Sequence, residues 1–168
     1  MAFNILRLGW GIDHPRHLPV CKLLILPSFD NPVSWDVVRV FERGADPQLR
    51  LYRSVWRMDI DHEVFDSPEE RAKHPETYRP TLETAWVLIA EDQLTAILNR
   101  FHTIHVPILV PNEMDGLDGI DYELTVGDHM FNVRLGWWCE MPKEWRELQP
   151  IANELVRLFE STWADRPQ

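Results

Sequence analysis

Residues 116–138 read GLDGIDYELTVGDHMFNVRLGWW, and this stretch decides the fold class. Two alternating runs of apolar and polar residues flank Gly127-Asp128. This dipeptide suits a two-residue type II′ turn, because glycine accepts the positive φ that the first central position requires. We therefore expect a β-hairpin whose apolar side chains share one face. Its predicted pairs are Val126 with His129, Leu124 with Phe131, Tyr122 with Val133, and Asp121 with Arg134.

The rest of the chain predicts further strands and helices, separated by prolines. We expect a short strand over 3–10 and a meander of strands over 20–26, 35–42 and 49–58. A capping box at 67–70, with proline at the first helical position, predicts the start of a short helix. Residues 82–102 indicate a strand followed by a helix, with one long helix as the alternative. Residues 105–119 are expected to form a loop.

A second main helix is predicted over about 144–163, and it either begins near Pro150 or kinks there. Together these elements predict an α+β fold, an antiparallel sheet of about five or six strands with two main helices packed on one face. We expect one globular domain over 1–168, with a short flexible end at 165–168.

Charge is unevenly distributed along the 168 residues, whose formal net charge is −10. Residues 59–80 hold seven acidic and three basic side chains, and residues 112–123 hold five acidic side chains and no basic ones. Nucleic acid is a poor partner for this balance, because phosphate binding draws on clustered Lys and Arg. A basic protein partner fits better.

Membrane spans and secretion signals are not predicted. No apolar run approaches the roughly 20 residues of a membrane span, and residues 1–7 do not follow the order of a secretory signal. We therefore expect a cytoplasmic protein without a membrane partner. The two cysteines, Cys21 and Cys139, are too few for a disulfide scaffold and wrongly spaced for zinc, and they are expected to be buried free thiols.

Two clusters could carry metal or acid–base chemistry. Asp59, Asp61, His62 and Glu63 place carboxylates and an imidazole in one predicted surface loop, where they could bind a divalent metal or share a proton in a small metal-dependent hydrolase. His102 and His105 could share a metal, although the helix is expected to end there. No nucleophile elbow, catalytic cysteine context or phosphate-binding glycine loop is found, and we predict no cofactor.

Eight tryptophans are spread over the whole chain, and this spread favours a role in core packing. Trp137-Trp138 is the exception, because neighbouring residues of a strand point to opposite faces. If Trp137 points inward together with Phe131, Val133 and Leu135, Trp138 faces outward, toward solvent, a partner or another element of the same fold.

The C-terminal third resembles a known pattern. Asp118-Gly119, Tyr122-Glu123-Leu124, a strand ending in Trp137-Trp138, then Pro142 and Trp145-x-x-Leu148 opening a terminal helix are similar to a pattern in small uncharacterised bacterial proteins. Some proteins of that size and acidity are encoded beside toxin genes as immunity factors. The resemblance covers about residues 116–160 and implies no catalytic residues.

Three hypotheses about function follow from these observations. The first is a non-catalytic protein-binding module, such as an immunity-type inhibitor of a basic toxin. It would use acidic residues for encounter and an aromatic anchor for slow release, namely Asp115, Asp118, Asp121, Glu123 and Trp138. The second is the metal-dependent hydrolase at Asp59–Glu63. The third is a small-molecule or glycan binder that uses exposed tryptophans for stacking.

Overall fold

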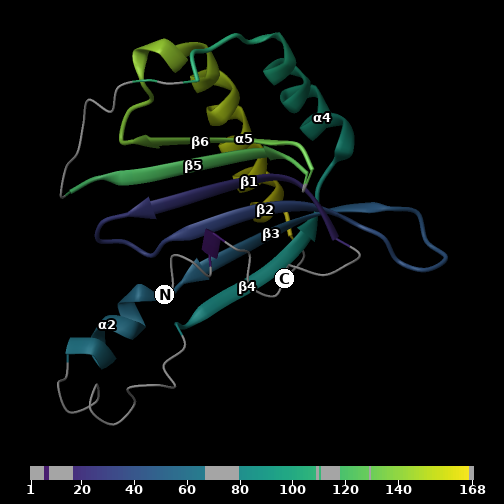
Figure 1. Ribbon diagram of the computed structural model, residues 1–168. Helices are drawn as coiled ribbons and strands as arrows, with labels where there is room; N and C mark the ends of the chain where they lie inside the picture. The colour runs from purple at the N-terminus through teal and green to yellow at the C-terminus, as the bar shows by residue number, and fades with distance from the viewer. Residues whose placement is uncertain are drawn as a thin grey trace.

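The computed structural model describes residues 6–7, 17–66, 80–108, 110, 118–128 and 130–166, with the side chains of 63–66 left out. Six strands form one antiparallel sheet in the order β4-β3-β2-β1-β5-β6 (Figure 1). The strands are β1 (His17–Pro27), β2 (Val33–Val40), β3 (Gln48–Trp56), β4 (Leu82–Leu88), β5 (Ile120–Gly127) and β6 (Asn132–Trp138). The helices are α2 (Met58–Asp66), α4 (Glu91–Asn99) and α5 (Gln149–Ala164), with short 3₁₀ turns η1 (Arg100–Thr103) and η2 (Lys143–Leu148).

This architecture confirms the predicted α+β class. The meander is present as β1, β2 and β3, and residues 82–102 form a strand and then a helix. α5 begins at Gln149, with Pro150 in its first turn, where the missing N–H leaves no helical hydrogen bond unmade. The helix start predicted at 67–70 lies outside the described residues. The strand predicted over 3–10 is described only at Leu6 and Arg7, which are helical.

One face of the sheet and two helices form the main hydrophobic core. Strand residues at alternate positions, such as Leu23, Val37 and Leu51, are buried together with Leu94 of α4 and Phe159 of α5. Figure 1 shows α5 running behind the sheet. Two buried tryptophans, Trp35 and Trp137, belong to this core. The rings of Trp35 and Phe159 lie 6.0 Å apart between centroids, and Trp137 is buried beside β5.

The opposite face of the sheet is buried over its centre as well. Leu24, Ser34 and Asp36 are buried there. Leu6 is also buried and packs against Leu24 and Leu26 on this second face. Apolar residues are therefore buried on both sides of β1, in agreement with the nearly continuous apolar run from Val20 to Leu26.

The predicted register of the β5–β6 hairpin is wrong. The observed pairs are Val126 with Val133, Leu124 with Leu135, and Tyr122 with Trp137. The turn is longer than two residues because Asp128 accepts hydrogen bonds from the backbone N–H groups of Met130 (2.7 Å) and Phe131 (2.9 Å). An Asp side chain that bonds the backbone two residues further on builds its own turn, and this one keeps residues 130–131 out of β6.

The shift moves each partner by an even number of residues, so every side chain of β5 keeps its predicted face. Tyr122 therefore stacks on Trp137 instead of facing Val133, with 5.3 Å between ring centroids and 9° between their planes. The expected inward positions of Phe131 and Val133 are also wrong, because both side chains are exposed. Arg134 lies opposite Thr125, and its guanidinium reaches Glu123 instead of Asp121.

Candidate functional site

The metal cluster predicted over 59–63 lies on a helix and not in a loop. Met58 to Asp66 form α2, so neighbouring side chains point in different directions. Asp59 is exposed and accepts two hydrogen bonds from Arg57, at 3.0 and 2.7 Å. This guanidinium holds the pKa of Asp59 well below its usual range. His62 is exposed, and the side chain of Glu63 lies outside the description.

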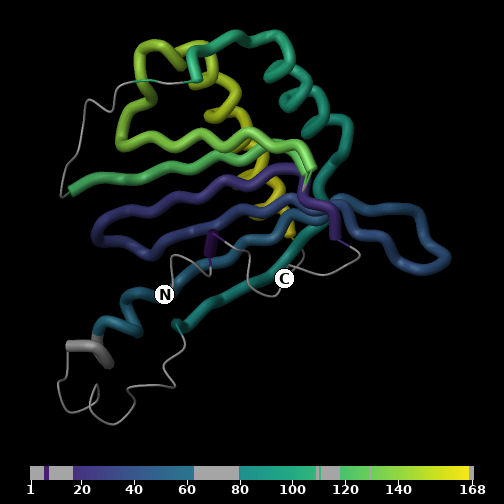
Figure 2. Tube along the Cα trace, in the orientation of Figure 1, coloured from purple at the N-terminus to yellow at the C-terminus, as the bar shows by residue number. Residues whose placement is uncertain are grey.

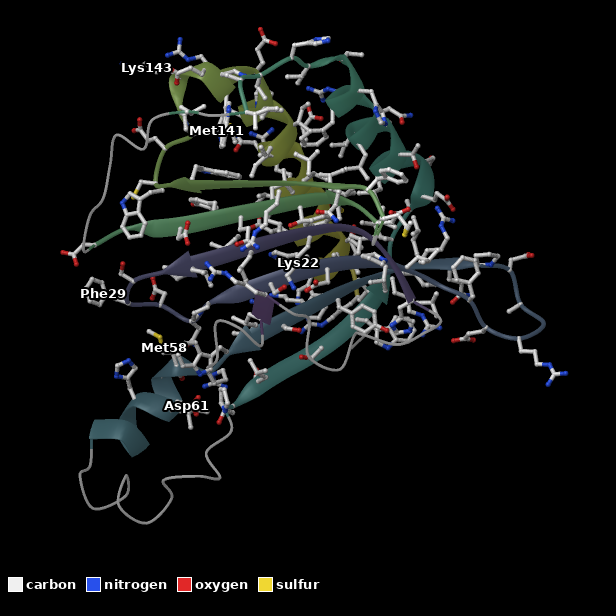
Figure 3. The ribbon with its side chains drawn as sticks, in the orientation of Figure 1. Lys22, Phe29, Met58, Asp61, Met141 and Lys143 are labelled. Atoms are coloured by element: carbon white, nitrogen blue, oxygen red, sulfur yellow. The ribbon has the colours of Figure 1, made fainter. Side chains whose placement is uncertain are left out.

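Asp61 turns inward from the same helix. Its carboxylate is buried and accepts hydrogen bonds from the indole N–H of Trp56 (2.5 Å) and the backbone N–H of Thr81 (3.0 Å). Figure 3 shows Asp61 between α2 and the start of β4. The carboxylate therefore joins α2 to two strand ends. Among the described residues, no three His, Cys, Asp or Glu side chains are grouped so that they could hold a metal ion.

His102 and His105 lie in and just after η1, and both are exposed. Cys21 is buried in the main core, which raises the pKa of its thiol. Cys139 is exposed, contrary to the expectation that both thiols are buried. The burial of Cys21 removes it from any reaction with a partner in solvent.

The acidic segment at 112–123 is partly neutralised within the fold. Asp115 lies outside the described residues, and Asp118 is exposed. Asp121 lies 3.8 Å from the guanidinium of Arg7, whereas Glu123 is buried and forms ion pairs with both Arg7 (3.3 Å) and Arg134. Two of the predicted partner-binding carboxylates thus have cationic neighbours in their own chain.

Trp138, the predicted aromatic anchor, packs inside the fold. It is half-buried, and its ring covers Gly119 so closely that a Cβ added there would lie 2.5 Å from the indole. Of the three outward directions left open by the sequence, the structure shows contact with another element of the same chain. Gly119 is the residue whose missing side chain permits this contact.

A buried polar group on the second face of the sheet was not anticipated. Lys22 of β1 lies 2.8 Å from Asp36 of β2, and Ser34 donates to the other oxygen of the same carboxylate. The ammonium group of Lys22 also donates to the backbone carbonyl of Leu6. Each partner is satisfied by its neighbours, so this group holds the backbone of Leu6 against the sheet.

Exposed apolar side chains gather at one end of the sheet. We call it the turn end, where β1 and β3 begin, β2 and β4 end, and the β5–β6 turn lies (Figure 2). Of the ten exposed large apolar residues that the structure describes, seven lie at or near this end: Leu18, Phe41, Trp86, Leu88, Met130, Phe131 and Val133. Phe131 is 82% exposed and Met130 is 79% exposed, values close to those of an extended chain.

The surroundings of this end are acidic. Glu42, Asp46, Glu91, Asp92 and Asp128 are exposed there, against the three cations Arg39, Arg43 and Arg50. Arg39 pairs with Glu91 (2.6 Å) and Arg50 pairs with Glu42 (2.5 Å). Five carboxylates against three guanidinium groups leave this end of the sheet with a surplus of negative charge.

Trp86 is the one tryptophan counted as exposed among the described residues. The guanidinium of Arg50 lies over its ring, 4.2 Å from the centroid, and Tyr52 lies at 6.5 Å between ring centroids. A ring already covered by a cation offers less of its face for stacking on a sugar.

Comparison with protein-family models, with characterised proteins and with solved structures finds no match to this chain. The resemblance over 116–160 to small bacterial proteins is a prediction that these comparisons do not test. None of the described helices is both long and apolar enough to cross a membrane.

Proposed function

We propose that the protein is a non-catalytic binding module whose turn end takes a basic protein partner, in the manner of an immunity-type inhibitor of a basic toxin. One observation carries the proposal: seven exposed large apolar side chains share this end of the sheet. Single scattered apolar residues need no explanation, whereas seven in one region of the surface suggest a site that binds a partner.

The charges around this surface indicate what kind of partner fits. Five exposed carboxylates against three guanidinium groups make the rim acidic. A basic surface would be drawn to such a rim during encounter, and burial of aromatic side chains would then slow its release. Phe131 and Met130 at the tip of the β5–β6 turn are the proposed anchors.

The experiment compares two equally exposed phenylalanines at opposite ends of the sheet. Phe29 is 78% exposed and lies at the end away from the β5–β6 turn (Figure 3). The purified chain is used to capture the products of neighbouring genes, in low and high salt. We expect one basic protein to bind. Phe131→Ser should weaken its binding about tenfold, as expected for a central aromatic anchor, and Phe29→Ser should leave it unchanged.

A second pair of variants separates the turn end from the acidic segment. Reversing Asp115 and Asp118 to Lys tests the segment predicted from sequence, and reversing Asp46 and Asp92 to Lys tests the rim of the turn end. Only the second reversal should abolish the salt-sensitive part of binding. Equal losses in Phe131→Ser and Phe29→Ser, or binding that salt does not weaken, would contradict the proposal.

A further inference from the structure

β4 is an outer strand of the sheet, and its far edge lacks the usual protection against pairing. Among the described residues no strand pairs with this edge, as Figure 1 shows for the outermost strand beside β3. The strand reads LETAWVL, with no proline, no lysine and an unbroken register of seven pairs with β3. Natural sheets blunt a free edge with charges, proline or a bulge, and β4 has one charged residue, Glu83.

The hydrogen bonds to β3 show which backbone groups point outward. The backbone N–H of Ile89 donates to the carbonyl oxygen of Leu49 (3.2 Å), and the backbone N–H of Arg57 donates to that of Thr81 (2.8 Å). The backbone groups of odd-numbered residues in this segment therefore bond to β3. In an antiparallel ladder the intervening residues then point their N–H and C=O groups the other way. Those outward residues are Leu82, Thr84, Trp86 and Leu88.

We propose that β4 pairs with β4 of a second copy of this chain about a two-fold axis at Ala85, which extends the sheet into the partner. This register sets Thr84 opposite the partner's Trp86 and Glu83 opposite the partner's Val87. All seven residues are paired, and about eight backbone hydrogen bonds form between the copies. The proposal does not depend on the basic partner at the turn end.

Faces and charges match in this register. Opposed residues differ by an even number of positions, so each face of one sheet continues into the same face of the other. Arg53, opposite Ala85 on β3, shares the face of Glu83. The Cα atoms of Arg53 and the partner's Glu83 would be about 12 Å apart, a gap that the two long side chains span. No like charges are opposed across the axis.

The surroundings of Arg53 favour an incoming carboxylate. Its guanidinium lies over the rings of Trp35 (5.4 Å) and Trp163 (5.6 Å). Burial and the nearby Arg166 lower the pKa of Arg53. A carboxylate brought by a second copy would offset both effects. Pairing would also cover Trp86 and Leu88, which are exposed on the other face.

The test measures molar mass by sedimentation equilibrium of the full chain. The wild type should reach twice the 19.9 kDa of one chain as concentration rises. Thr84→Pro removes one outward N–H from each copy and leaves the β3–β4 ladder intact. It should raise the dissociation constant of the dimer by about tenfold or more. Thr84→Ala is the matched control, because both variants lose the 2.9 Å contact between the hydroxyls of Ser54 and Thr84.

A charge-swap experiment tests the register without introducing proline. Ala85 is exposed and lies on the proposed axis, so Ala85→Lys or Ala85→Glu places two like charges opposite each other. Each variant alone should be monomeric, and an equal mixture of the two should recover the dimer. A wild type that stays monomeric, a Thr84→Pro dimer as tight as that of the control, or a mixture that stays monomeric would overturn the proposal.

Salt distinguishes this inference from the proposed function. Two copies that each carry a net charge of −10 repel one another, so salt should tighten the dimer. The binding of a basic protein at the turn end should instead weaken as salt is added. Loss of the basic partner in Thr84→Pro, with no wild-type dimer, would assign the β4 edge to that partner and reject pairing between copies.

Discussion

A carboxylate buried away from water needs donors close by, and Trp56 and Thr81 both donate to Asp61. These contacts explain why an acidic residue occupies the inner side of α2 without requiring a metal ion or a reaction. The neighbouring Asp59 is bound to Arg57 at the surface. Two carboxylates only two positions apart therefore have unlike roles, because the helix points them in different directions.

Removal of the Asp61 carboxylate should destabilise the fold strongly. Asp61→Ala leaves the N–H groups of Trp56 and Thr81 without this acceptor, and we expect a loss of about 2–4 kcal/mol in the free energy of unfolding. Urea denaturation measures the loss. His62→Ala is the control on the same helix, because its side chain is exposed and its loss should change stability by less than about 0.5 kcal/mol. A smaller effect for Asp61→Ala than for the control would reject this structural role.

Asp121 makes a different prediction, which concerns pH. Burial raises the pKa of this carboxyl above its ordinary value of 3.8, and the attraction of Arg7 only partly offsets the shift. A raised folded-state pKa means that the fold favours the protonated form. The stabilising contribution of the protonated Asp121 carboxyl is fully present below pH 3.8. It is lost as pH rises through the raised pKa of the folded state.

Asp121→Asn should therefore gain stability relative to the wild type as pH rises from about 3.8 toward neutrality, since the amide does not ionise. Urea midpoints measured across this range give the difference between the two proteins. Asp118→Asn is the control, because it removes a carboxylate that is exposed. A difference that shrinks with rising pH would mean that the ion pair with Arg7 outweighs the cost of burial.

Among the elements, the β5–β6 hairpin shows how one turn changes what the molecule displays. Gly127 has φ +118°, and a Cβ added there would clash with the carbonyl oxygen of Phe131. Only glycine fits this position, which ties the observed turn to one residue. If the turn had two residues, Met130 and Phe131 would lie within β6.

Gly127→Ala should destabilise the protein by about 2 kcal/mol or more, through both the positive φ and the clash. Gly136→Ala is the control in the same hairpin, because an added Cβ there meets its nearest atom at an ordinary 3.8 Å. Thermal unfolding of both variants measures the difference. Equal stability of the two would contradict the observed turn.

The strands and helices were largely predictable because their patterns are local. Alternation along β5 and β6, the prolines between elements and the periodicity of α5 all depend on near neighbours in sequence. The turn was not predictable from the Gly127-Asp128 dipeptide, because the Asp128 side chain competes with the two-residue turn. The helical position of residues 58–66 was also missed, since Asp59 and Asp61 look like surface loop residues until Trp56 and Arg57 are placed beside them.

The candidate surface was less predictable than the fold. Sequence alone cannot show that residues near 18, 41, 88 and 131 share one end of the sheet, because this depends on strand order. The count of charges from the sequence also treated Asp121 and Glu123 as free negative charge, whereas Arg7 and Arg134 lie beside them. The number of acidic side chains was known from the sequence, but where they lie on the molecule is shown only by the fold.

At the scale of the whole molecule, apolar surface and negative charge coincide at the turn end, and pairing through β4 would leave much of that end uncovered. The β5–β6 turn lies at the opposite side of the sheet from the β4 edge. A dimer would therefore carry two copies of the proposed binding surface. Each could take one basic protein independently.

The most direct test measures the dissociation constant of the captured basic partner for the wild type, Phe131→Ser and Phe29→Ser by calorimetry, in about 0.1 M and about 1 M salt. We predict that Phe131→Ser raises this constant about tenfold at both salt concentrations. The dissociation constant of Phe29→Ser should match that of the wild type. High salt should weaken partner binding by all three proteins. Identical constants for the two variants, or affinity indifferent to salt, would contradict a binding surface at the turn end.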